Sequence, residues 1–152
     1  MGAHACPTLY ILMRTDMTSL NSGKAQAQAA HAANVFMYRA YNAPTILPEG
    51  FEQWTGDENV FGFPEEEPDS LIQSKGAGTT ITLAVGSERE LREIVMAARE
   101  DGFVAALYED KTYPVRDGAV THLIPVITCG YVFSPCRNNS RPSSIAGLAL
   151  HP

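Results

Sequence analysis

The sequence predicts an α/β fold, a single-domain sandwich in which helices flank a mixed four-stranded sheet in the order β-α-β-α-β-β. Three observations support this prediction. Short apolar and β-branched runs alternate along the chain with segments of helical periodicity. The 152 residues suffice for one domain with a buried core. No apolar stretch approaches the roughly 18 residues that span a bilayer, so we expect no association with a membrane.

The first strand and the first helix are the clearest elements. Residues 8–14 form an apolar run that is typical of a buried strand. A polar loop follows over residues 15–22, in which Asn21 or Ser22 is the expected N-cap. The alanine-rich segment from about residue 23 to 41 contains no proline and predicts a long helix.

Residues 42–78 form an acidic insertion that contains aromatic residues, and its prolines and glycines break any regular pattern. A disordered linker rarely has so many aromatic residues, so we expect local structure, including a short helix near residues 48–55. Phe51 and Trp54 could stack on a nucleotide or anchor the insertion to the core. The surrounding negative charge favours the anchor.

The second half of the chain repeats the alternation. Residues 79–85 predict a strand, and Ser87 with Glu90 forms a capping box before a helix that ends at Gly102. A third apolar strand is expected over residues 103–108, followed by a short polar connection over 109–118.

The fourth strand is expected over residues 120–133, with Pro125 at an edge position or a bulge. Residues 134–152 predict an irregular tail. The two helical crossovers predict parallel neighbouring strands, and the short last connection predicts an antiparallel pair.

The net charge of −6 is unevenly distributed. Eight acidic residues and no lysine or arginine lie between residues 40 and 74, and the remainder has nine acidic against eleven basic residues. Any affinity for RNA therefore rests on a few well-placed cations. The three cysteines form no CxxC pair, so we expect a reducing, cytoplasmic environment and no metal site.

The most informative motif lies at the start of the first helix. Lys24, Gln28 and His31 are spaced by four and three residues, so they share one side of that helix. Gly23 and Lys24 lie in the first turn, where free N–H groups and the helix dipole favour a phosphate. The strand, the glycine-lysine helix start and the small alanines together indicate a binding site.

This motif and the strand before it resemble the sequence of a known family. Arg14-Thr15-Asp16 and then Gly23-Lys24-(x)3-Gln28-(x)2-His31-Ala32 resemble the opening of the peptidyl-tRNA hydrolases of the archaeal and eukaryotic type, the second class of that activity. The later segments Leu107–Asp110 and Gly118–Thr121 resemble that family's third strand, active-site loop and fourth strand. The resemblance covers about residues 8–40 and 78–128.

The resemblance implies a function and a site. It implies hydrolysis of the ester bond of peptidyl-tRNA without a cofactor, and four catalytic residues: Lys24, Asp110, Thr112 and Thr121. It implies substrate-binding positions at Arg14, Gly23, Gln28 and His31, and Lys111 is a further candidate. A homodimer is left open.

One departure from the family pattern concerns the loop after the acidic residue. The family usually has Asp-Ala-Gly-Arg-Thr, whereas this chain has Asp110-Lys111-Thr112, which is shorter and lacks the arginine. Lys111 is a candidate to replace the missing charge.

Simpler interpretations also stay open. Lys24 could be a solvated first-turn residue, and Gln28 and His31 could be packing or surface residues. The Asp110 segment could be an ordinary turn. Thr112 and Thr121 could simply favour strand structure. A catalytically inactive domain of this fold that binds RNA or protein is the alternative function. A third is another transfer or hydrolytic reaction on an aminoacylated or nucleotide substrate.

Overall fold

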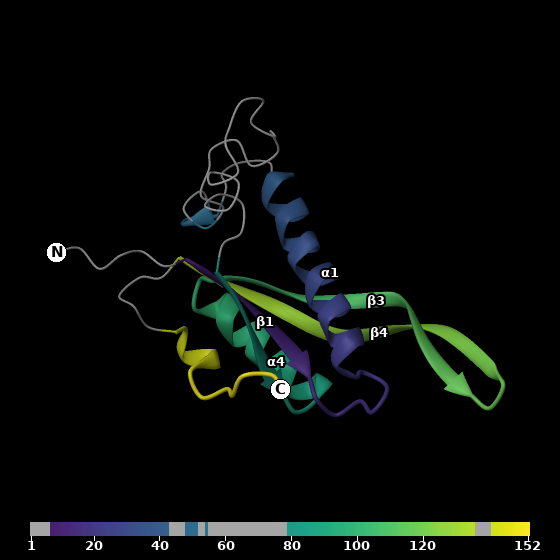
Figure 1. Cartoon of the computed structure of the whole chain (residues 1–152). Coiled ribbons are helices and arrows are strands. Elements are labelled where there is room, and N and C mark those ends of the chain that lie inside the picture. The colour runs from purple at the N-terminus through teal and green to yellow at the C-terminus, as the bar shows by residue number, and fades with distance from the viewer. Residues whose placement is uncertain (1–6, 43–47, 52–53, 55–78, 136–140) are drawn as a thin grey trace, which may run out of the picture.

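The computed structural model describes residues 7–42, 48–51, 54, 79–135 and 141–152. The elements in these residues are, in order, β1 (Thr8–Arg14), α1 (Ser22–Tyr41), β2 (Thr79–Val85), α4 (Glu88–Glu100), β3 (Val104–Asp117), β4 (Val120–Ser134) and a 3-10 helix (Ser143–Ile145). The predicted α/β fold with a mixed four-stranded sheet is confirmed (Figure 1).

The strand order is β2-β1-β4-β3, and it corrects one expectation. The first crossover joins parallel neighbours, β1 and β2, and the last connection joins the antiparallel pair β3 and β4, both as predicted. The second crossover does not join neighbours, because β1 and β4 lie between β2 and β3. Right-handed crossovers that run in opposite directions across a sheet place their helices on opposite faces. The crossovers from β1 to β2 and from β2 to β3 run in opposite directions, so α1 and α4 lie on opposite faces.

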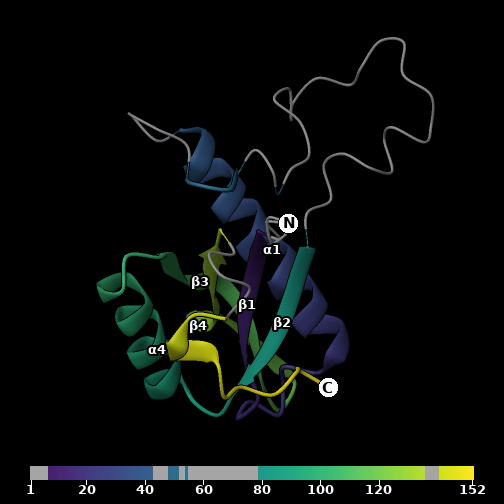
Figure 2. The same cartoon turned by 90° about the vertical axis from the view of Figure 1, so that its left-hand side faces the viewer.

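The two helices cover opposite faces of the sheet (Figure 2), and each face has its own core. The alternation along β1 divides its side chains between them: Ile11 packs toward α1, and Leu12 packs toward α4. Phe36 of α1 and Leu91 of α4 are fully buried in these two cores. Burial of both sheet faces explains the uninterrupted apolar sequence of β1.

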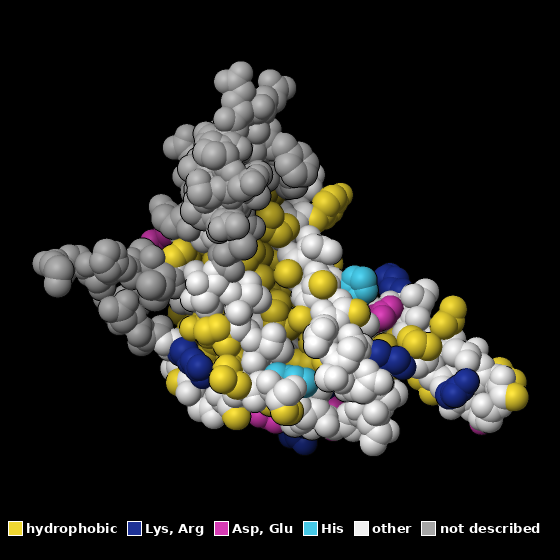
Figure 3. All heavy atoms as spheres, in the orientation of Figure 1, with side chains coloured by type: hydrophobic (Ala, Val, Ile, Leu, Met, Phe, Trp, Pro, Cys, Tyr) yellow, Lys and Arg dark blue, Asp and Glu magenta, His cyan; other side chains and the backbone are white. Residues whose placement is uncertain are grey.

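The expected polar connection over residues 109–118 is wrong. These residues continue β3 as far as Asp117, and β3 pairs with β4 in a long hairpin that turns at Gly118, where φ is +59°. The end of the hairpin projects from the body of the molecule as an arm, which we define as residues 114–123 (Figure 1). Hydrophobic side chains are exposed on this arm, including Val120 and Leu123 (Figure 3).

Two irregularities interrupt the pairing of β3 with β4. Glu109 pairs with Ile127 and Tyr108 with Cys129, which leaves Thr128 as an extra residue on β4. Past Asp110, the next paired residue of β3 is Tyr113, opposite Ile124. Pro125 therefore lies at this second irregularity and beyond the part of β4 that pairs with β1, so its predicted position is confirmed.

Residues of the insertion and of the tail contribute to the core. Phe51 and Trp54 are buried against Phe36, and the indole N–H of Trp54 donates to the carbonyl oxygen of Thr79 at 2.8 Å, so the anchor interpretation is confirmed for both residues. The rest of the insertion, residues 43–47, 52–53 and 55–78, lies outside the described residues, and with it most of the short helix predicted near residues 48–55. In the tail, Ile145 is fully buried, and Leu150 forms a bridge to Leu83 on the outer edge of β2.

Candidate active site

One side of α1 faces β3, and three contacts join them in sequence. Lys24 Nζ lies 5.5 Å from the centre of the Tyr113 ring. Gln28 Nε2 donates to Asp110 Oδ2 at 2.8 Å. The His31 ring centre is 5.9 Å from that of Tyr108. Helical spacing thus places these three side chains of α1 along β3, so Lys24 and Asp110 lie on the same side of the molecule.

The start of α1 is open to a ligand. Asn21 is the N-cap, and its side-chain oxygen accepts from the backbone N–H of Lys24 at 3.0 Å. Among the described residues, none accepts from the N–H groups of Ser22 and Gly23. A Cβ at Gly23 would meet only the Asn21 oxygen, at 3.6 Å, so packing within the protein does not require glycine here. The missing side chain leaves room above the positive end of the helix.

Asp110 is held as an anion by its neighbours. Besides the Gln28 amide at Oδ2, its Oδ1 accepts from the backbone N–H of Thr112 at 2.9 Å and lies 3.4 Å from the Thr112 hydroxyl. Partial burial alone raises the pKa of Asp110, but these hydrogen bonds and the charge of His31 outweigh it and hold that pKa below its ordinary value. The carboxylate is thus ionised and fixed in orientation.

Sequence reasoning missed Thr128, which completes this network. Its hydroxyl, fully buried, donates to Gln28 Oε1 at 2.6 Å. Because the amide oxygen is taken by Thr128, the amide nitrogen of Gln28 is directed at Asp110. Thr128 is also the extra residue of the β4 irregularity, and a local shift in strand pairing has no signature in an apolar run such as Val-Ile-Thr-Cys.

Cys129, the next residue, packs beneath the same network. Its thiol donates to the backbone carbonyl of Gln28 at 3.6 Å. Burial, together with the nearby Asp110 charge, raises the pKa of Cys129 to about 12, although the Thr128 hydroxyl acts in the opposite direction. A thiol in this state is not a nucleophile at neutral pH, so Cys129 is a packing residue.

The aromatic ring of Tyr113 packs against the Lys24 ammonium. It is fully buried, and its hydroxyl shares a hydrogen bond of 2.9 Å with Ser19 of the loop between β1 and α1. The contact with the ring face places the Lys24 ammonium beside β3. In the part of the chain that the structure describes, no carboxylate forms an ion pair with Lys24, so its charge is available to a ligand.

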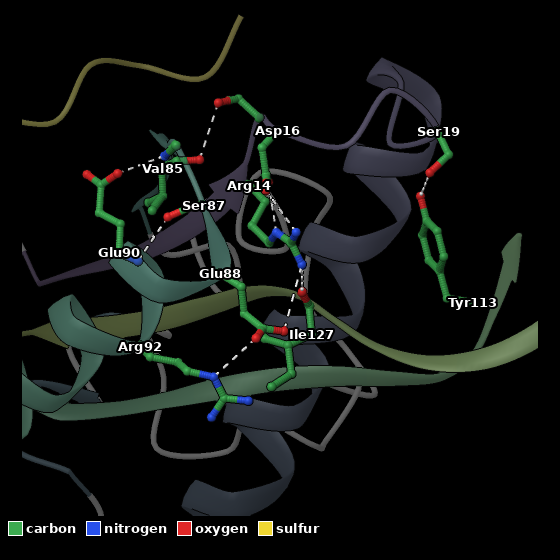
Figure 4. Close-up of polar contacts among 12 residues, drawn as sticks. Arg14, Asp16, Ser19, Val85, Ser87, Glu88, Glu90, Arg92, Tyr113 and Ile127 are labelled. Atoms are coloured by element: carbon green, nitrogen blue, oxygen red, sulfur yellow. Dashed lines mark hydrogen bonds and ion pairs between the residues drawn. The ribbon is translucent and has the colours of Figure 1, made fainter.

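Arg14 is engaged within the protein (Figure 4). Its Nε and Nη2 donate to the two carboxylate oxygens of Asp16, each at 2.9 Å, and its Nη1 donates to the carbonyl oxygen of Ile127 at 2.8 Å. The bidentate pair fixes the loop that precedes α1, and the third bond fixes the backbone beside Thr128. This geometry indicates that Arg14 positions other parts of the site.

The remaining predicted residues divide into two groups. Thr112 and Lys111 are exposed within the irregularity beside Asp110. Thr121 lies on the arm, where it pairs with Arg116. Asp110 pairs with Val126, and five residues of strand separate Val126 from Thr121, which is roughly 17 Å. The structure therefore brings together Lys24, Gln28, His31 and Asp110, with Thr112 and Lys111 adjacent, and does not bring Thr121 to them.

The fold and this cluster define a class of protein: an α/β sandwich with a lysine at a helix start and an amide-bound carboxylate on the neighbouring edge strand. The chain belongs to the PTH2 peptidyl-tRNA hydrolase family, because the family's sequence model, described as Peptidyl-tRNA hydrolase PTH2, matches residues 8–126. No curated protein matches the sequence. None of the helices within the described ranges is both long and apolar enough to cross a bilayer.

Proposed function

We propose that this protein hydrolyses the ester bond between a peptide, or an N-blocked amino acid, and the ribose of tRNA. The observation that carries the proposal is the link from α1 to β3 in which Gln28 binds Asp110 one helical turn from Lys24. Membership of the peptidyl-tRNA hydrolase family supports the same substrate. Such a reaction belongs to translation, and we assign it to the cytoplasm.

Asp110 is suited to orient the attacking water. Its oxygens accept three hydrogen bonds, and a carboxylate has about four lone-pair sites, so one site remains for a water. A carboxylate of lowered pKa is a weak base. Its main role is therefore to align the water, and it accepts the proton only during the attack, when bonding to the ester carbon has made that proton acidic.

Lys24 is suited to bind negative charge. The ester carbon becomes tetrahedral during attack, and its oxygen gains a negative charge that an ammonium stabilises. The exposed N–H groups of Ser22 and Gly23 lie in the same turn and add to this positive region. A phosphate of the tRNA terminus and the oxyanion would both be favoured here, and Lys111, exposed beside Asp110, provides a further cation.

Three other residues hold this arrangement. Thr112 binds one carboxylate oxygen of Asp110, and Gln28 binds the other. Thr128 fixes the amide of Gln28, so we assign to Thr128 the supporting role expected of a fourth-strand threonine. We assign no role to Thr121.

The test is hydrolysis of N-acetyl-aminoacyl-tRNA by the purified protein with a chelator present. We expect release of the N-acetyl amino acid, and we expect Lys24→Met and Asp110→Asn each to lower kcat/KM by about a hundredfold or more. Arg89→Gln and Asp117→Asn are matched controls, because both side chains are highly exposed and outside the site.

Two results would overturn the proposal. Unchanged turnover in both site variants would remove the site assignment. No turnover by the wild-type protein, with salt-sensitive binding of tRNA retained, would favour an inactive RNA-binding domain.

A further inference from the structure

A second concave region lies at the other end of α1. A cavity of about 350 Å³ opens where the C-terminal ends of α1 and α4 meet the beginning of β3. Its apolar lining includes Phe36, Val104 and Ala106, and two cationic side chains, Arg39 and Arg99, contribute to its wall. We call it the two-arginine cavity.

Both guanidinium groups have N–H donors left for a ligand. Arg39 Nη1 donates to the Tyr131 hydroxyl at a long 3.4 Å, and Arg99 Nε donates to the carbonyl oxygen of Ala105 at 2.6 Å. These contacts orient the guanidinium groups without neutralising them. No residue in the described ranges forms an ion pair with either arginine. Two uncompensated guanidinium groups beside an apolar lining fit a carboxylate on a short apolar stem.

Strand β3 connects this cavity to the candidate active site. Ala105 and Ala106 line the cavity, and Asp110 follows on the same strand after about 17 Å of extended chain. Helix α1 runs beside β3 in the opposite direction, since Lys24 contacts Tyr113 and His31 contacts Tyr108. A ligand that extends along β3 from Asp110 would therefore reach the cavity.

The outer edge of β3 is suited to an extended peptide. β3 is the outermost strand of the four-stranded sheet, whereas the opposite outer strand, β2, is bridged by Leu150 of the tail. Backbone groups on the outer edge of a sheet offer hydrogen bonds to a peptide, here as far as Ala105, whose carbonyl oxygen already accepts from Arg99, and a pocket beside the edge gives side-chain selectivity.

We propose that the two-arginine cavity binds an acidic side chain of the substrate's peptide, about five residues before the ester bond. The inference rests on the proposed function, because the ester must lie at Asp110 for the peptide to run along β3. It adds a specificity site that is separate from the reacting groups and that a single N-blocked amino acid is too short to reach.

The experiment compares three substrates with one tRNA: N-acetyl-aminoacyl-tRNA, and two peptidyl-tRNAs of about seven residues with Glu or Gln five residues before the ester. For the wild-type protein we expect the KM of the Glu substrate to be about tenfold lower than that of the Gln substrate. Arg39→Gln and Arg99→Gln should remove this difference and leave the KM of the short substrate unchanged. Arg89→Gln, an exposed arginine on α4, is the matched control.

A variant that adds a negative charge provides a second measurement. Val104 is 41% exposed at the rim of the cavity, so the carboxylate of Val104→Glu can reach solvent and lie beside the two arginines. We expect this variant to lose most of the preference for the Glu substrate.

The outcomes distinguish the inference from the proposed function. Hydrolysis of the short substrate, with equal KM for the Glu and Gln peptides, would overturn the inference alone. An equal rise in KM for all three substrates in the arginine variants would assign the arginines to the tRNA and would also overturn it. Failure to hydrolyse even the short substrate would overturn both.

Discussion

At the scale of single residues, the candidate site depends on one carboxylate and the groups that hold it. Asp110 has both oxygens engaged, by Gln28 on one side and Thr112 on the other. Thr128 then fixes which end of the Gln28 amide faces the carboxylate. Such a chain orients the carboxylate before a substrate binds, which lowers the reorganisation required during reaction.

The state of Asp110 gives a prediction about pH. Because its pKa is held below the ordinary value, the carboxylate stays ionised as the pH falls, and the acid limb of kcat/KM should lie below that of an ordinary aspartate. Gln28→Leu removes a hydrogen bond to the anion, so the pKa rises and the acid limb moves to higher pH. The pH profile of kcat/KM measures this shift, with Gln26→Leu, exposed on the same helix, as control. An unchanged profile would show that Asp110 does not set the acid limb.

Thr128 gives a second prediction. Thr128→Val keeps the volume but leaves Gln28 Oε1 buried without its donor, which costs about 1–3 kcal/mol of unfolding free energy. The amide is then free to turn its oxygen toward Asp110, and we expect a loss on the order of tenfold in kcat. Thr128→Ser, which restores the hydroxyl, should recover most of the activity. Equal activity of the Val and Ser variants would contradict a role in positioning.

The sequence predicted part of this site. Lys24, Gln28 and His31 follow helical spacing, which is local and readable, and the structure directs all three at β3. Thr121 and Thr128 both lie on β4, and nothing local indicates which of them reaches α1. That choice depends on the register between two strands and on the extra residue that shifts it.

At the scale of elements, the N-terminus of α1 combines a stability role with the binding role that we propose for it. Asn21 accepts from the backbone N–H of Lys24 and so holds the first turn. Asn21→Ala should lower the free energy of unfolding by about 1 kcal/mol, which for a domain of this size corresponds to a fall of roughly 2–4 °C in Tm. Ser22→Ala is the matched control, because Ser22 is the first residue of the helix and its side chain does not cap it. Equal Tm values for the two variants would contradict the assignment of Asn21 as the cap.

The β3–β4 hairpin shows why one element was misread. Residues 109–118 are mostly polar, and polar residues between apolar runs are typical of a loop. In the structure they form a strand in which Tyr113 is buried, while the outer part extends beyond the two helices (Figure 1) and Arg116 and Asp117 are exposed. A paired strand with so few buried side chains offers little apolar alternation by which to recognise it.

At the scale of the whole molecule, the strand order could not be read from the sequence. Element order predicted the two crossovers and the β3–β4 hairpin, but β4 lies beside β1 through long-range pairing that no local pattern indicates. The tail is irregular apart from a short 3-10 helix, as expected, and Ile145 is fully buried against the α4 face of the sheet. The apolar residues between Ile145 and Leu150 do not by themselves indicate which of them is buried.

The tail gives a prediction about global stability. Ile145→Ala removes a fully buried side chain and should lower the free energy of unfolding by about 2–4 kcal/mol. Leu150→Ala, at a position 65% exposed, should change it by less than about 0.5 kcal/mol. Chemical denaturation of the two variants measures both values. Similar values for both would contradict the packing of the tail on the core.

The central claim is that Lys24 and Asp110 act in one site, and a double-mutant cycle tests it most directly. Single-turnover hydrolysis of N-acetyl-aminoacyl-tRNA is measured for the wild type, Lys24→Met, Asp110→Asn and the double variant. Groups that act together on one transition state are strongly non-additive, so we expect the double variant to be about as slow as the slower single variant. Losses that multiply in full would contradict the claim, because they would show that the two residues act independently.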